Sequence, residues 1–135
     1  MGSNKACPVL FQDSALSKIL VFRHPFAGVQ LVKGTIEPGE GPADAALREL
    51  REESGFGDAR VELDLGLWDS SFEDQVWSIY LCSTPRALPE AWVHRTKDGG
   101  GLDFKFFWHP VDQKPDATWH PLFQRALEHI LSVLL

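Results

Sequence analysis

Three glutamates lie close together within a segment whose pattern predicts a helix. Glu49 and Glu53 are four residues apart and Glu52 is three residues from Glu49, so on a helix the three carboxylates share roughly one face. Carboxylates that are packed together repel one another and raise one another's pKa values, unless a cation offsets their charge. Their oxygens are hard ligands that suit Mg²⁺ or Mn²⁺, and Mg²⁺ is typically shared between carboxylates and substrate phosphates. The cluster therefore indicates metal-assisted phosphate chemistry.

The same acidic string also has a purely structural interpretation. Charged runs on a helix are usually solvated surface, and Arg48 and Arg51 could pair with part of the negative charge. The preceding stretch from Gly34 to Pro42, GTIEPGEGP, is rich in turn residues. Its glycines would let backbone groups approach a metal ion or a phosphate closely, which is consistent with the chemical interpretation.

A helix over about residues 42–54 is predicted to carry the glutamates. Pro42 suits the first turn of a helix, and Gly55 suits the left-handed residue that ends one. Apolar residues recur at helical spacing and form a stripe that faces the core, namely Ala43, Ala46, Leu47 and Leu50. Because Leu50 turns away from the glutamates, it would anchor the helix while the acids stay accessible.

Strand-like segments surround this helix in the sequence. Five segments rich in aliphatic and aromatic residues are predicted to be strands, namely residues 18–23, 28–32, 60–68, 75–82 and 102–108. Residues 83–101 are predicted to form a loop, and Thr118 is predicted to cap a last helix with Pro121 in its first turn. This mixed order predicts an α/β fold with a sheet covered by helices. No linker divides the chain, so a single domain over residues 1–135 is expected.

The segment from Gly34 to Phe56 resembles the Nudix box. That box reads Gly, five residues, Glu, seven residues, Arg-Glu, an aliphatic residue, any residue, Glu-Glu, any residue, Gly and a bulky apolar residue. Every defined position is matched, by Gly34, Glu40, Arg48, Glu49, Leu50, Glu52, Glu53, Gly55 and Phe56. A pattern of this length is a specific signal. The resemblance implies a Nudix-like α/β/α sandwich with a mixed β-sheet between helices.

The resemblance also implies the metal ligands. Glu53 would be a principal ligand of Mg²⁺ (or Mn²⁺), with Glu49 and Glu52 as further ligands. The carbonyl group of Gly34 would complete part of the metal shell. Either Glu49 or Glu52, or a more distant acid, would help to deprotonate the attacking water.

Supporting residues are implied both inside and outside the box. Arg48 would be structural, holding Glu49 and the loop acid Glu40 in place. Many members of the family recruit another acid from a loop before a late strand. Asp103 occupies the expected place for this metal ligand, and Asp98 and Glu90 are rivals for the role.

Basic residues near the predicted site could bind phosphate. Lys33 directly precedes the box and could reach a substrate phosphate, although a solvated lysine at a strand end is an equally good interpretation. His94, Arg95 and Lys97 fall in the predicted loop. That loop could contact phosphate or guard the pocket, because loops often carry binding residues.

The resemblance implies metal-dependent hydrolysis of a diphosphate linkage in a nucleoside diphosphate derivative, with water attacking phosphorus. A dinucleoside polyphosphate or (d)NTP pyrophosphatase is an alternative. An isomerase that uses metal and a non-catalytic nucleotide-sensing module are alternatives from other classes. A sensing module would be expected to lose one or more metal-site glutamates, and all of them are intact in this chain.

Composition sets the remaining expectations. The formal net charge of -6 argues against stable nucleic-acid binding through a broad basic surface, and the resemblance implies a small-molecule nucleotide as partner. Cys7 and Cys82 lack a zinc spacing and are expected to be reduced, buried thiols. No membrane span or signal peptide is predicted, so a cytoplasmic location is expected. The apolar C-terminal helix would pack either on the core or on a second subunit in a homodimer.

Overall fold

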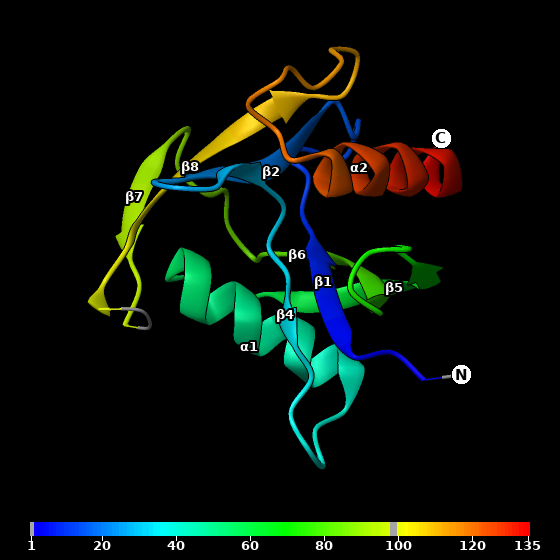
Figure 1. The fold of residues 1–135 in the computed structure, drawn as a ribbon. Coiled ribbons are helices and arrows are strands. Elements are labelled where there is room, and N and C mark those ends of the chain that lie inside the picture. Colours follow the sequence, from blue (N-terminus) through cyan, green and yellow to red (C-terminus); the bar gives the residue numbers. More distant parts are fainter. Residues whose placement is uncertain (1, 98–99) are drawn as a thin grey trace.

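Two β-sheets and two helices make up the computed structural model, which describes residues 2–97 and 100–135 (Figure 1). The first sheet has the strand order β4-β1-β6-β5 and the second has the order β3-β2-β8-β7. The strands of the first sheet are β1 (Lys5–Val9), β4 (Gly34–Thr35), β5 (Arg60–Asp69) and β6 (Val76–Ser83). Those of the second sheet are β2 (Lys18–His24), β3 (Gly28–Gln30), β7 (Trp92–Arg95) and β8 (Asp103–Pro110).

The first sheet is mixed, as predicted. Strands β1 and β6 run parallel, with Cys7 opposite Ile79, whereas the other pairs in this sheet are antiparallel. All strand pairs of the second sheet are antiparallel. The single predicted sheet is therefore two four-stranded sheets, and β1 was not predicted because a five-residue strand containing a proline gives only a weak period-two signal.

Helices α1 (Pro42–Ser54) and α2 (Pro121–Leu134) cover opposite sides of the strands (Figure 1). Side chains alternate along a strand, so Ile19 and Val21 of β2 join the core beneath α2, whereas Leu20 and Phe22 join the core beneath α1. The predicted α/β/α sandwich is thus confirmed, with an apolar core on each side of the strands.

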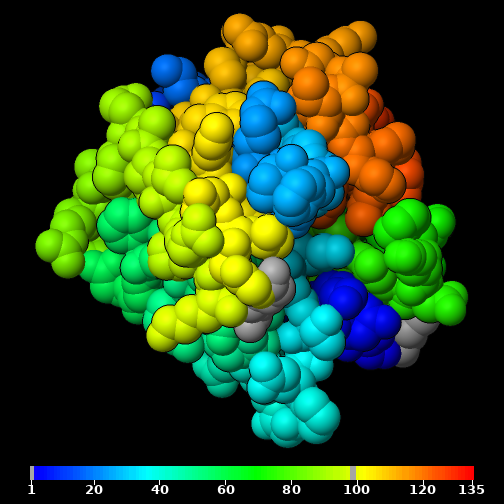
Figure 2. All heavy atoms as spheres, turned by 60° about the vertical axis from the view of Figure 1, so that its left-hand side comes forward, coloured from blue at the N-terminus to red at the C-terminus, as the bar shows by residue number. Residues whose placement is uncertain are grey.

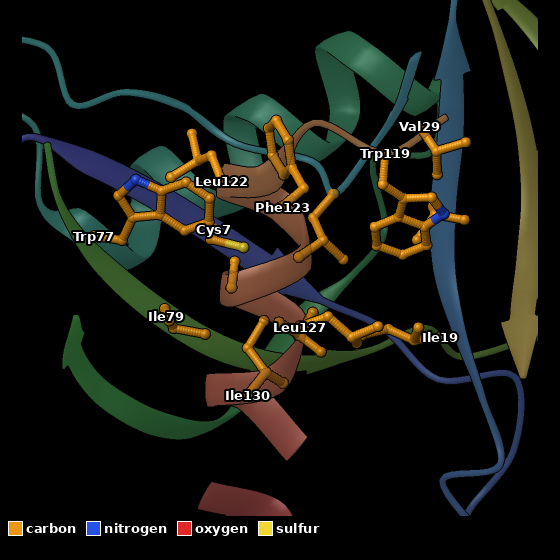
Figure 3. Packing of buried hydrophobic residues seen from close by; sticks show 14 of the residues in the cluster. Cys7, Ile19, Val29, Trp77, Ile79, Trp119, Leu122, Phe123, Leu127 and Ile130 are labelled. Carbon is orange, nitrogen blue, oxygen red and sulfur yellow. The ribbon is translucent and has the colours of Figure 1, made fainter. Parts of the chain in front are cut away.

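Helix α2 packs on the core of its own chain. Its buried side chains, among them Phe123, Leu127 and Ile130, lie over Cys7 and Ile79 of the first sheet (Figure 3). The predicted Thr118 cap is wrong: His120 caps the helix, and its Nδ1 accepts a hydrogen bond from the Leu122 N–H at 3.0 Å. Neither helix in the described part of the chain is long and apolar enough to cross a membrane.

Helix α1 has the predicted bounds. Gly55 adopts a φ of 86°, and its N–H donates to the Arg51 carbonyl oxygen at 2.9 Å, which ends the helix. Ala45, Ala46 and Leu50 are buried, so α1 turns its apolar side to the sheets. The glutamates are left facing the neighbouring strands and loops.

The predicted loop over residues 83–101 was only partly correct. Strand β7 lies within it and pairs with β8, placing Trp92 opposite Phe106 and Arg95 opposite Asp103. The strand is four residues long between irregular segments, and so short a run carries little periodic signal. It forms because β8 offers an edge to pair with.

Candidate active site

Arg48 lies at the centre of the acidic group. Its Nε donates to Glu40 Oε2 at 2.7 Å, and its Nη1 donates to Glu49 Oε1 at 2.9 Å. Its Nη2 donates to the carbonyl oxygen of Thr35 at 2.8 Å, which ties α1 to the preceding segment. The hydrogen bonds from Arg48 lower the pKa of Glu40. Arg48 therefore contacts both acids that the resemblance places beside it.

Glu49 and Glu53 lie one helical turn apart, and Glu53 is the more deeply buried. Their carboxyl groups are in hydrogen-bonding contact, and the backbone N–H of Lys33 donates to Glu53. Burial raises the pKa of Glu53 well above its ordinary value, and the charge of Glu49 adds to the effect. Burial also raises the pKa of Glu49. Glu53 Oε2 is buried and has no hydrogen-bond partner among the described residues.

Gly34 brings the backbone against this carboxylate pair. The residue belongs to β4 and lies opposite Ala6 of β1. A Cβ atom at this position would overlap the carboxylate of Glu49. Any side chain at this position would have to displace the Glu49 carboxylate, so the reason for glycine is close packing and not its backbone φ.

The acid group suits a shared magnesium ion better than a closed metal cage. Glu52 is the most exposed of the three glutamates, and Arg48 donates to its Oε2 at 3.1 Å. In the described part of the chain, no three His, Cys, Asp or Glu side chains form a ready-made metal site. Mg²⁺ keeps several waters and often takes only one or two carboxylates together with substrate phosphates. The unpartnered, buried oxygen of Glu53 beside Glu49 fits an ion held in that way.

A cleft of about 700 Å³ opens in front of the glutamates. Helix α1 forms one wall, and the hairpin of β7 and β8 forms the other; Figure 2 shows the molecule from the side of this hairpin (yellow). The lining residues are Lys33, Glu49, Arg51, Glu52, Glu53, Gly55, His94, Arg95, Thr96, Lys97, Leu102 and Phe104. A volume of this size accommodates a nucleotide-sized ligand.

Asp103 does not join the three glutamates. It lies between Leu102 and Phe104, which line the cleft, and it is not a lining residue itself. Its carboxylate pairs with Arg95, with Oδ1 at 3.1 Å from Nε. Asp103 lies directly opposite Arg95 in the pairing of β7 with β8, so the two side chains share one face of the hairpin and pair with each other.

The two rivals of Asp103 are not brought to the cleft either. Glu90 is exposed and accepts a hydrogen bond from Gln12 at 3.0 Å, and it is absent from the cleft lining. Asp98 lies outside the described residues. The geometry thus gives no support to Asp103 or Glu90 as a fourth acid.

Lys33 lines the cleft, but its ammonium group is engaged elsewhere. Nζ donates to Gln75 Oε1 at 3.2 Å and lies 5.5 Å from the centre of the Trp77 ring and 5.6 Å from that of Phe123. Burial lowers the pKa of Lys33. Since Gln75, Trp77 and Phe123 do not line the cleft, the predicted phosphate contact has no support from this geometry.

The apolar floor of the cleft was missed in the sequence. Phe104 lines the cleft and stacks on Phe22 at 4.4 Å between ring centres. A signal was available, because Leu102, Phe104 and Phe106 alternate along the predicted strand and must share one face. The sequence did not indicate which face of this strand borders the glutamates, because that depends on how the second sheet packs against α1.

Comparison with known proteins agrees with this architecture. A family model of the NUDIX domain matches residues 4–129. The structure is similar to that of a UDP-X diphosphatase, with a TM-score of 0.71 and 18% identity over 99% of this chain; the chain spans 63% of that protein. It is also similar to an ADP-ribose pyrophosphatase from Streptococcus suis, with a TM-score of 0.70 and 15% identity over 99% of this chain and 90% of that one.

A third similar structure is a Nudix hydrolase from Nitrosomonas europaea, with a TM-score of 0.65 and 21% identity over 98% of this chain and 90% of that one. No curated protein sequence matches. At these identities the structural likenesses establish the fold, whereas the family match covers most of the chain. The complete box and the match over residues 4–129 show that this chain is a member of the Nudix hydrolase family.

Proposed function

We propose that this enzyme hydrolyses a diphosphate linkage in a nucleoside diphosphate derivative, with Mg²⁺ or Mn²⁺ as cofactor. The observation that carries the proposal is the buried pair of Glu49 and Glu53, whose unpartnered oxygen lies at a cleft large enough for a nucleotide. A bound divalent ion would neutralise the diphosphate oxygens and help an attacking water to lose its proton.

The chain's own residues would prepare this chemistry. Glu53 and Glu49 would hold the cation from α1, with Glu52 and the Gly34 carbonyl group as further ligands. Arg48 keeps the Glu49 carboxylate in place, so that little reorganisation accompanies binding. Of the two candidates for proton acceptor, we favour Glu49, because it lies beside the buried Glu53 and is itself largely buried, whereas Glu52 is more exposed.

The substrate class rests on the cleft and on the similar structures. Two of these are named for a UDP-linked and an ADP-linked substrate, and both names describe a nucleoside diphosphate joined to a second group. The apolar side chains of Leu102 and Phe104 in the cleft lining would limit the access of water to the bound diphosphate. A dinucleoside polyphosphate or a nucleoside triphosphate is the alternative substrate that the test should include.

The test is a substrate screen with and without Mg²⁺ or Mn²⁺. Nucleotide sugars, ADP-ribose, dinucleoside polyphosphates and nucleoside triphosphates would be incubated with the enzyme and the products separated by ion-exchange chromatography. Metal-dependent release of a nucleoside monophosphate from at least one class is expected. Metal binding without turnover of any class would contradict the proposal and favour a nucleotide-sensing role.

The assignment of the proton acceptor has its own test. In Glu49→Gln the acidic limb of the pH profile of kcat should disappear, whereas in Glu52→Gln it should remain. Retention of that limb in Glu49→Gln would assign the role to another group.

A further inference from the structure

The two walls of the cleft differ in charge: the α1 wall carries three acids beside the cation Arg51, whereas the described lining residues of the hairpin wall include basic side chains and no acid. Every acidic residue among the described lining residues lies on α1, as Glu49, Glu52 and Glu53. The hairpin wall instead contributes three residues whose side chains carry nitrogen atoms that can bind an anion, namely His94, Arg95 and Lys97. A ligand that spans this cleft therefore meets the three glutamates only at the α1 side, and meets basic side chains without an acid at the hairpin side.

The hairpin wall is fastened to the end of α1. Trp92 Nε1 donates to the carbonyl oxygen of Ser54 at 2.9 Å, and the Trp92 ring stacks on Phe106 at 4.9 Å. His94 packs so closely against Gly55 that a Cβ atom there would be 2.8 Å from His94 Nδ1. These contacts fix the separation between the two walls before any ligand binds, which lowers the cost of binding.

The cations of the hairpin wall differ in how far they are already neutralised. Arg95 is held by Asp103 at 3.1 Å and donates to the Gly101 carbonyl oxygen at 3.0 Å. Its charge is thus partly offset and its guanidinium group is fixed in place. Lys97 is exposed and forms no ion pair with another described residue. Among the contacts of the described residues, the charge of Lys97 is thus less offset than that of Arg95.

We propose that the hairpin wall selects substrates in which the group attached to the nucleoside diphosphate carries its own anion, a phosphate or a carboxylate, bound by Lys97 with support from His94 and Arg95. This inference rests on the proposed function, since the diphosphate must lie at α1 for its second group to reach the hairpin. Charge-assisted hydrogen bonds from lysine and arginine are the usual means of binding such groups.

The experiment compares pairs of substrates that differ in an anionic group. UDP-glucuronate against UDP-glucose tests a carboxylate, and diadenosine tetraphosphate against diadenosine diphosphate tests added phosphates. For each pair the ratio of kcat/KM is measured with Mg²⁺, and the ratio of Kd is measured by calorimetry with Ca²⁺ in its place. The variant is Lys97→Glu. The matched control is Lys105→Glu, which makes the same charge change on the same hairpin at a residue outside the cleft lining.

In the wild-type enzyme, kcat/KM should be higher for the more anionic substrate of at least one pair. Lys97→Glu should lower this preference by about tenfold, which corresponds to the loss of one charge-assisted contact. Lys105→Glu should change it little. An unchanged ratio in Lys97→Glu, or an equal fall in Lys105→Glu, would overturn the inference. If the Kd ratio responds as expected while no substrate is hydrolysed, the anion site stands and the proposed hydrolysis fails.

Discussion

Replacing Glu53 with glutamine tests the central claim about the acidic group. The substitution keeps the shape of the side chain and removes its charge. Glu53 Oε2 is buried without a described partner, and the Glu53 side chain interacts with that of Glu49. The glutamine amide can donate to the Glu49 carboxylate, so the variant relieves a repulsion and pairs a buried group. It also removes the oxygen charge that would bind a cation.

The gain in stability without metal and the loss of cation binding have opposite signs and can be measured separately. An unsatisfied buried polar group costs about 1–3 kcal/mol, so in excess chelator at mildly alkaline pH the variant should be more stable by that order. For a chain of this size the shift in Tm is roughly 3–5 °C per kcal/mol. A metal ion contributes several kcal/mol of transition-state stabilisation, so kcat/KM should fall by roughly 10³-fold.

The assays are thermal unfolding with chelator and with Mg²⁺, and turnover of the best substrate from the screen. Mg²⁺ should raise the Tm of the wild-type protein, because it binds only the folded state, and it should not raise that of Glu53→Gln. Glu128→Gln, an exposed glutamate on α2, is the matched control and should behave as wild type. Wild-type turnover, or an unchanged response to Mg²⁺ in Glu53→Gln, would refute the metal assignment.

Three further predictions concern the same group. In chelator, the pKa values of Glu49 and Glu53 are raised in the folded state, which therefore holds protons that the unfolded state releases. The stability that these two protonated glutamates contribute is present below their ordinary pKa of 4.5 and is lost as pH rises through the raised values. A Tm difference between wild type and Glu53→Gln that does not grow with pH would contradict this. Gly34→Ala should displace the Glu49 carboxylate and lower kcat/KM by about 100-fold with an unchanged circular dichroism spectrum; wild-type rates would show that the close packing is irrelevant. Arg48→Lys should lose the paired hydrogen bonds to Glu40 and lower the urea midpoint of unfolding, and an unchanged urea midpoint would show that these bonds are not needed.

The box and its helix could be predicted from the sequence because they depend on local spacing. Residues three and four apart on a helix are neighbours whatever surrounds them, so the shared face of Glu49, Glu52 and Glu53 followed from their positions. Pro42 and Gly55 marked the ends of α1 for reasons of backbone conformation, and both ends agree with the structure. The order of strands and helices likewise predicted a sandwich.

Other features depended on contacts between distant segments. Arg48 and the preceding turn could be placed beside Glu40 only through the family resemblance, since the two residues are eight apart. The burial of Glu53 follows from the packing of α1 against the residues around Lys33. A local sequence pattern does not predict how deeply Glu53 is buried compared with Glu49 and Glu52. Burial is what raises the pKa of Glu53.

The second wall of the cleft was decided by tertiary structure alone. Strand β7 exists because β8 pairs with it, and Trp92 and His94 then fasten it to the end of α1. The same pairing turns Asp103 away from the glutamates and toward Arg95. Local spacing thus determined where the acids that would bind the metal lie on their helix. The packing of the second sheet against that helix decided what faces them, because cross-strand pairing and sheet-to-helix contacts join residues that the sequence keeps far apart.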